Sequence, residues 1–184
     1  MTCSESETAL KYPIGRFTVE HLEKQTDPAT RQLRIESLAK TPSLFECAVA
    51  GLTEEQQNVP YRPGGWSIRQ VVHHMADSHL QAYAVFKMTL TTDKPLLRMY
   101  DCAAWGEFVD ARTGPVAASL SLLSGVHARW DLLLHSMDVE GFSRSFERPE
   151  WGGLITLDNF LQMLDWHHRH HLAQVTNVRH KQGR

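Results

Sequence analysis

Apolar residues recur at helical spacing in four long stretches of this 184-residue chain, and this pattern restricts its possible folds more than any other feature. The stretches cover residues 28–51, 67–91, 115–137 and 156 onward. The stripe of the second stretch consists of Ile68, Val71, Val72, Met75, Ala82 and Phe86. Sustained alternation of apolar and polar residues, which is typical of strands, is almost absent. The sequence therefore predicts an all-α protein, a four-helix bundle in which each helix buries one apolar stripe.

Capping and breaking residues mark where these helices begin and bend. Asp27, Ser67 and Thr156 each stand directly before an apolar stretch, where a short polar side chain can cap free backbone N–H groups. Pro115 is expected to open the third helix. Pro42 should bend or break the first one near its middle.

The connections between the helices are long. Residues 92–114 leave room for a short helix at about 101–108, and residues 139–155 are expected to hold a turn between two short extended pieces. Because a minimal up-down bundle uses short loops, these connections predict a different path of the chain. We see no linker and therefore expect one domain over residues 1–184, with residues 1–26 as an irregular lead-in.

Charge, cysteine usage and hydropathy exclude several classes of protein. The net charge is −2 with histidine neutral and no basic stripe is visible, so we expect no nucleic-acid partner. No apolar run approaches the ~18 residues of a membrane span, and the first residues do not resemble a signal peptide. Cys3, Cys47 and Cys102 are widely spaced and odd in number, which argues against a disulfide framework. Together these features predict a cytoplasmic protein.

Eleven histidines are unusual for such a chain, and seven of them fall in two helical segments. The second segment, within the fourth helix, reads HHRHH over residues 167–171. At about 100° per residue, His167 and His171 share the inward face of the helix, one turn apart. His168 leans inward at the edge of the apolar stripe, and His170 is expected to turn toward solvent.

The first segment, HHMADSH over residues 73–79, offers one further inward histidine. His74 lies at the edge of the apolar stripe of its helix, whereas His73 lies far round on the polar side. An i,i+4 pair on one helix and a third imidazole from a facing helix can hold one divalent ion and leave a position open to water. Imidazole suits zinc, nickel, copper and iron alike. The alternative is that these histidines are hydrogen-bonded core residues.

Four segments of the chain resemble the DinB-like superfamily, and within it the YfiT group of proposed metal-dependent hydrolases. They are KYPIGRF (11–17), YRPGGWSIRQVVHHMADSH (61–79), the stretch from Tyr100 to Trp105, and GGLITL…WHHRHHLA (152–173). The resemblance implies a four-helix bundle, commonly a homodimer, with zinc or nickel held by three histidines. By motif these are His74, His167 and His171. The family often has a further histidine where this chain has Gln174, and an apolar residue where it has Asp165.

Three functions remain open at this level. The first is a hydrolase in which the metal activates water for attack on a small substrate. The second is a transferase of low-molecular-weight thiols such as bacillithiol, and the third is a non-catalytic metal-binding stress-response bundle. Asp77 either orients an imidazole, or it faces solvent or pairs with Arg69. Cys102 has little support as a ligand, and no general acid or base can be assigned.

Overall fold

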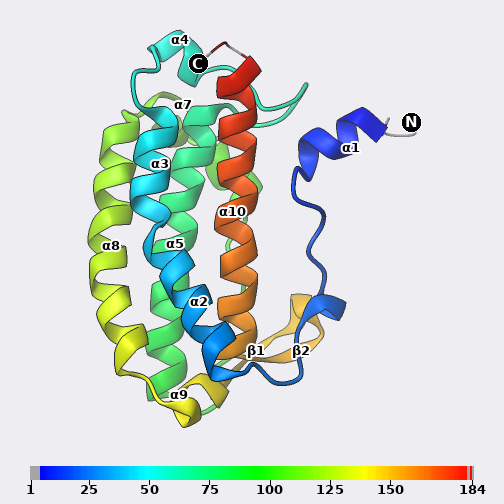
Figure 1. The fold of residues 1–184 in the computed structure, drawn as a ribbon, viewed down its shortest axis with the longest axis vertical. Coiled ribbons are helices and arrows are strands. Elements are labelled where there is room, and N and C mark those ends of the chain that lie inside the picture. The colour runs from blue at the N-terminus through cyan, green and yellow to red at the C-terminus, as the bar shows by residue number, and fades with distance from the viewer. Residues whose placement is uncertain (1–4, 182, 184) are drawn as a thin grey trace.

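The computed structural model describes residues 5–181 and 183, and its main body is a bundle of helices, as predicted (Figure 1). The long helices are α5 (Ile68–Thr91), α8 (Val116–Ser136) and α10 (Leu157–Lys181). The fourth position is shared by α2 (Pro28–Ala39) and α3 (Thr41–Val49). None of the helices in the described ranges is both long and apolar enough to cross a bilayer.

Local chemistry places the helix ends where the sequence predicted them. Asp27 and Ser67 accept hydrogen bonds from the backbone N–H groups three residues ahead, at 3.0 and 3.2 Å. Thr156 does the same at the start of α10, at 3.1 Å. The first predicted helix breaks between Ala39 and Thr41, so that Pro42 falls in the first turn of α3, where it needs no hydrogen-bond partner.

The order of the helices around the bundle differs from their order along the chain. α10 packs against α2, α3 and α5, and α8 packs against α5, α2 and α3. Figure 1 shows that α5 and α8 run in one direction while α2, α3 and α10 run in the other. Consecutive helices α5 and α8 are therefore parallel neighbours, and the chain must return along the whole bundle between them. This explains the long connection at residues 92–115.

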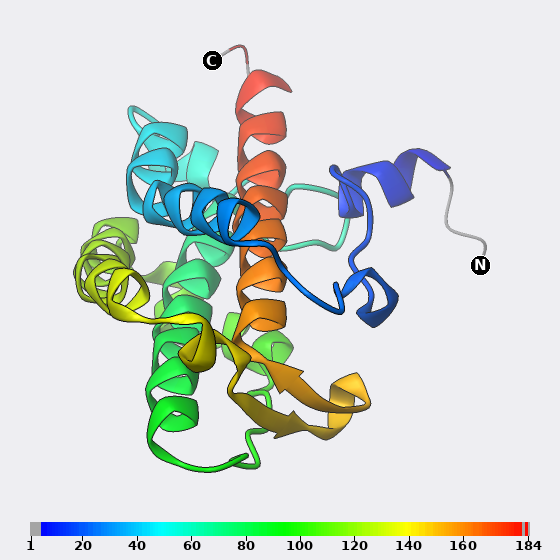
Figure 2. The same cartoon turned by 60° about the horizontal axis from the view of Figure 1, so that its bottom comes forward.

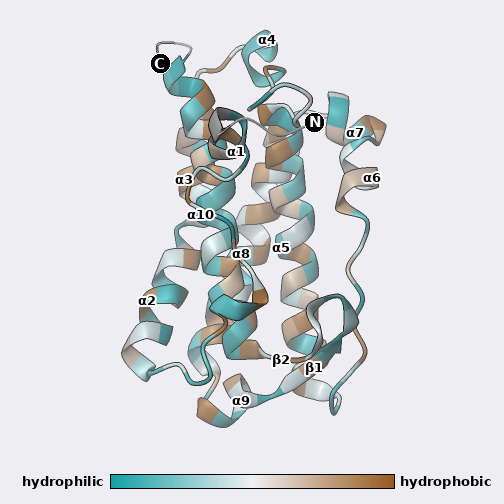
Figure 3. Cartoon of the chain, turned by 90° about the vertical axis from the view of Figure 1, so that its right-hand side faces the viewer, coloured by the Kyte–Doolittle hydropathy of each residue, from teal (hydrophilic) through white to brown (hydrophobic). Residues whose placement is uncertain are grey.

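Short elements fill the connections. In the 92–115 connection the chain runs back along α5 through α6 (Cys102–Gly106) and α7 (Val109–Thr113), as Figure 3 shows, whereas the sequence predicted one short helix. β1 (Ser145–Arg148) and β2 (Gly153–Thr156) form an antiparallel hairpin beside the bundle (Figure 2), as expected for residues 139–155. The remaining elements are α1 (Glu5–Lys11), η1 (Val19–His21), α4 (Glu54–Gln57), α9 (Val139–Ser143) and η2 (Pro149–Trp151).

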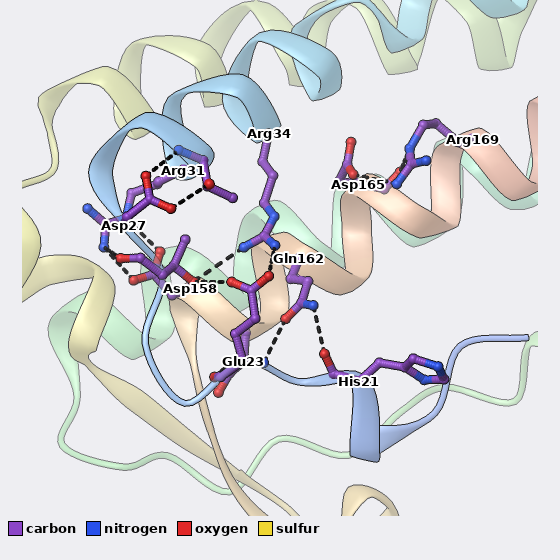
Figure 4. A network of polar contacts seen from close by, with 12 residues as sticks. His21, Glu23, Asp27, Arg31, Arg34, Asp158, Gln162, Asp165 and Arg169 are labelled. Carbon is purple, nitrogen blue, oxygen red and sulfur yellow. Dashed lines mark hydrogen bonds and ion pairs between the residues drawn. The ribbon is translucent and has the colours of Figure 1, made fainter.

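Residues 12–27, here called the N-terminal strap, run beside α10 and are tied to it. Glu23 N–H donates to the Gln162 side chain at 3.1 Å, and Gln162 donates to the His21 carbonyl at 2.8 Å (Figure 4). At the end of the strap, Arg31 and Asp158 form a two-bond ion pair at 2.6 Å that joins α2 to α10. The lead-in is thus only partly irregular, because α1, free of proline and glycine, forms a helix.

The core consists of two apolar clusters with histidines between them. One cluster contains the aromatic residues Phe86, Trp130 and Phe160, and the other contains residues such as Phe45 and Met75. Along α10 the sequence passes from the first cluster through residues 167–171 to the second. Cys47 and Cys102 are free thiols, and Cys3 lies outside the described residues. The histidines between the two clusters are therefore the candidate functional residues of the fold.

Candidate metal centre

α5 and α10 bring together the three histidines that the sequence selected. The Nε2 atoms of His74 and His167 lie 3.2 Å apart, and one nitrogen from each of the three rings lies within 4.8 Å of the others. His171 completes the group, with its ring centroid 4.8 Å from that of His74 and 4.6 Å from that of His167. The convergence on which the metal hypothesis depends is therefore present. The role of the three residues as ligands remains a prediction.

The donor set fits a divalent ion. Zinc–nitrogen bonds of roughly 2.0–2.1 Å in a tetrahedron place ligand nitrogens roughly 3.3 Å apart, close to the observed separation of His74 and His167. Burial, and then repulsion between the imidazoles, lowers the pKa of all three rings well below the usual value. The rings are therefore neutral at physiological pH, and each keeps a lone pair for a metal.

Two of the three imidazoles are oriented by hydrogen bonds on the side away from the centre. Gln174 Oε1 accepts from Nδ1 of His171 at 2.9 Å, which leaves Nε2 of His171 unprotonated. The Tyr100 hydroxyl lies 3.2 Å from Nδ1 of His74. Burial raises the pKa of the Tyr100 phenol, so the phenol stays protonated. Gln174, which departs from the family pattern, is thus part of the site.

Gln174 also joins the site to the N-terminal strap. Its amide nitrogen lies 3.0 Å from the carbonyl oxygen of Lys11 and 3.1 Å from Nε2 of His170. The prediction that His170 turns toward solvent was wrong, because only 5% of this residue is exposed. Tyr12 of the strap covers that face of α10, and His170 stacks on Trp166 with ring centroids 4.5 Å apart. The sequence contains no clear sign that an irregular segment would cover this face.

His73 is kept away from the centre, as its place on the helix predicted, but it is not on an exposed polar face. Its Nδ1 lies 2.7 Å from the Ser119 hydroxyl, and its Nε2 lies 3.1 Å from the Gly114 carbonyl oxygen. The turn before α8 covers this side of α5 and buries the ring. Helical periodicity alone did not predict that the turn before α8 would bury His73.

A second group of histidines follows the alternative interpretation, that of hydrogen-bonded core residues. Nδ1 of His79 and Nε2 of His127 lie 2.7 Å apart between α5 and α8. His168 is 1% exposed, which confirms its inward position, and its Nε2 lies 3.0 Å from the Ser37 hydroxyl. His127 was missed, because a lone histidine on a long helix carries no spacing signal.

Asp77 neither hydrogen-bonds an imidazole nor pairs with Arg69 among the described contacts, and it is partly exposed to solvent. The contact with the outer nitrogen of His74 comes from Tyr100, and Arg69 donates to an amide and a backbone oxygen elsewhere. Burial, together with the nearby Asp110 carboxylate, raises the pKa of Asp77 to about 6. Asp77 is therefore a titrating carboxylate beside the site, with no hydrogen bond to the three imidazoles among the described contacts.

The histidine centre opens into a mostly apolar cavity of about 100 Å³. His74 and His167 form part of its wall, and α5, α10, the β1–η2 segment and residues 97–102 form the rest. The 97–102 segment is held there because Leu97 N–H donates to the Glu147 carbonyl of β1 at 2.9 Å. Cys102 also lines the cavity, but burial raises its pKa and keeps it a thiol, which argues against a ligand or nucleophile role.

Comparison with known proteins finds relatives of this chain in both sequence and fold. The family model of the DinB superfamily matches residues 37–175. YfiT of Bacillus subtilis, named as a proposed metal-dependent hydrolase, is 39% identical over 175 residues, which cover 95% of this chain and 96% of the relative. A Bacillus pumilus protein with the same description is 40% identical over 172 residues, or 93% of this chain and 95% of the relative. The solved structure of Bacillus subtilis YfiT, described as an unusual four-helix bundle, superimposes with a TM-score of 0.90 at 38% identity, and the match covers 95% of this chain and 98% of that one.

Proposed function

Because the chain belongs to the DinB superfamily, we propose that it is a metal-dependent hydrolase in which His74, His167 and His171 hold one divalent ion. The chemistry that an ion held by three neutral imidazoles supplies is the activation of water near neutral pH and the polarisation of a carbonyl or phosphoryl oxygen. We propose zinc or nickel as the metal and a small molecule as the substrate.

The observation that carries this proposal is the opening of the centre into the cavity. A structural zinc site is closed by four protein ligands, whereas a catalytic site has three and faces a space for water or substrate. Here the group of described residues contains three histidines and no fourth histidine, cysteine or carboxylate, and two of the three line the cavity. This arrangement favours a catalytic centre over the stress-response bundle with a structural ion.

The chain's own residues have distinct roles in such a reaction. Gln174 and Tyr100 orient the imidazoles of His171 and His74. If Nδ1 of His74 donates to the Tyr100 oxygen, the phenol proton is free to donate to a substrate oxygen, since Tyr100 also lines the cavity. The apolar wall binds the hydrocarbon part of the substrate and limits the entry of bulk water.

The test compares hydrolysis and thiol transfer in one preparation. Tag-free protein is stripped with a chelator, reloaded with zinc or nickel, and assayed on small esters and amides without thiol. A second arm adds bacillithiol and monochlorobimane. We expect metal-dependent cleavage without thiol. Metal-dependent conjugation without cleavage would replace the proposal with a thiol transferase, and inactivity in both arms with stoichiometric metal would indicate the non-catalytic bundle.

Separate measurements test which metal the protein binds, whether it forms a homodimer and where it lies in the cell. Elemental analysis of tag-free protein tests zinc and nickel, and light scattering tests the homodimer that the family resemblance implies. The cytoplasmic location is likewise a proposal, which fractionation of the source cells tests.

A further inference from the structure

Arg148 occupies a core position in β1. The residues of this strand alternate between the two faces, so that Phe146 and Arg148 point inward while Glu147 is exposed. Arg148 is 8% exposed, and its partner across the hairpin is Gly153, which has no side chain. A buried inward position in a strand is normally apolar. The arginine at this position therefore requires an explanation.

The guanidinium of Arg148 forms no ion pair or hydrogen bond with a carboxylate among the described residues, although the charge of Glu150 lies near enough to act on it. Its Nε is buried without a hydrogen bond, and Arg148 takes part in no ion pair there. Its neighbours are the rings of Trp151 and Phe160, at 4.5 and 5.7 Å. Burial lowers the pKa of Arg148 to about 10 although Glu150 opposes this, so the group is still charged at neutral pH. A buried charge without a counter-ion is costly.

The cavity that Arg148 lines is the one into which the histidine centre opens. The described residues that line it include Arg148 and the exposed Arg98 but no aspartate or glutamate. The wall thus combines apolar surface, two positive charges and two of the three histidines of the centre. Such a cavity raises the local concentration of anions.

The distance between the arginine and the centre can be estimated along α10. Arg148 lies over the ring of Phe160, and His167 follows Phe160 by seven residues on the same helix. At 1.5 Å per residue this is about 10 Å. A molecule with an oxyanion at Arg148 would therefore place a group about two helical turns away beside the histidines.

We propose that Arg148 binds the oxyanion of the substrate, so that the substrate class is a small apolar molecule ending in a carboxylate or phosphate about 10 Å from the bond that is cleaved. A guanidinium fork binds either group through two parallel hydrogen bonds, which a buried site strengthens. This inference rests on the proposed function for the identity of the cavity as the substrate site. The binding of the anion is nevertheless measurable without catalysis.

The test measures binding of three probes to the metal-loaded protein by calorimetry. 4-Phenylbutyrate carries the carboxylate, 3-phenylpropylphosphonate carries a phosphate-like group, and 4-phenylbutyramide is the neutral control. Intrinsic tryptophan fluorescence is a second signal, because Trp151, one of five tryptophans in the chain, contacts the guanidinium. We expect at least one anion to bind tenfold or more tightly than the amide, and the better anion identifies the group. Arg148→Gln should reduce the preference to within twofold, and Arg148→Lys should keep part of it.

Arg98→Gln is the matched control, because Arg98 is an exposed arginine of the same cavity. We expect it to keep most of the preference. His171→Ala, which we expect to lack metal, separates binding at Arg148 from binding to the ion, and it should also keep the preference. Equal binding of anion and amide by the wild type, or loss of the preference in His171→Ala but not in Arg148→Gln, overturns the inference. Anion binding by a protein without hydrolytic activity would instead refute the proposed function alone.

Discussion

Replacing Gln174 by alanine tests whether hydrogen bonding on the outer side of the centre determines metal affinity. The side chain is 3% exposed and its Oε1 accepts the Nδ1 proton of His171 at 2.9 Å. This bond keeps Nε2 of His171 unprotonated and aligned with the other two imidazoles. Without it the ring can rotate and change tautomer.

The expected loss follows from the size of such bonds. Removing the partner of a metal-bound imidazole typically lowers metal affinity 10–100-fold, or about 1.4–2.8 kcal/mol. Gln174→Ala also removes the contacts with Lys11 and His170, so we expect a stability loss of about 1–3 kcal/mol in the metal-free protein. The two effects are separable, because the first appears in metal binding and the second in urea unfolding.

Two further variants test whether the orientation of His171 or the contact with the strap causes the loss of metal affinity in Gln174→Ala. Gln174→Glu keeps an acceptor for His171 but cannot donate to the Lys11 carbonyl, so its metal affinity should stay within about threefold of the wild type. Gln162→Ala loosens the same strap at His21 and Glu23 without touching the histidines, and its affinity should change by less than about threefold. Affinity is measured by competition with a chelating dye for zinc and for nickel.

The reasoning is refuted if Gln174→Ala binds metal as tightly as the wild type. It is also refuted if Gln162→Ala loses as much affinity as Gln174→Ala, since the strap rather than the orientation of His171 would then be responsible.

Three other outcomes are expected. His171→Ala should lose stoichiometric metal in elemental analysis while its far-ultraviolet circular dichroism stays that of the wild type; unchanged metal content would remove His171 from the site. Asp77→Asn should stabilise the protein at high pH, because the pKa of Asp77 is raised to about 6 in the folded protein, so that its contribution to stability is full below pH 3.8 and is lost as the pH rises through about 6. Urea unfolding should show that the variant gains up to about 3 kcal/mol at pH 8 and about half of that at pH 5. A gain that does not depend on pH would exclude the titration of Asp77 as its cause. Asp158→Ala leaves Arg31 without its carboxylate partner and should lower the free energy of unfolding in urea by about 2–3 kcal/mol. This loss is smaller than for a fully enclosed ion pair because the pair borders an open groove, and a loss below about 0.5 kcal/mol would contradict the reasoning.

Much of the fold could be predicted because it depends on local signals. The apolar stripes predicted the helices, and Asp27, Ser67 and Thr156 predicted where three of them begin, since a cap acts within four residues of chain. The selection of His74 was equally local, because its position on the helix decided which way it faced. These signals require no knowledge of how the helices are arranged.

What could not be predicted depends on segments that cover a helix from outside. His170 is buried by the strap and His73 by the turn before α8, and neither segment has a periodic pattern that indicates where it packs. Arg148 was missed for a related reason. In the sequence it is one charged residue near a turn, and only the pairing of β1 with β2 shows that it points inward.

The distance along the chain between the two halves of the candidate metal centre has a mechanical consequence. His74 and His167 are separated by 93 residues, and the segment between them includes α6 to α9, the β1–β2 hairpin and much of the cavity wall. An ion that binds both ends cross-links this segment in the way a disulfide would. Closing a loop of this size in the unfolded chain stabilises the folded state by at most about 4–5 kcal/mol through lost chain entropy. The metal-loaded protein should therefore have a larger free energy of unfolding in urea than the metal-free protein and resist proteases within this segment, independently of any reaction that it catalyses.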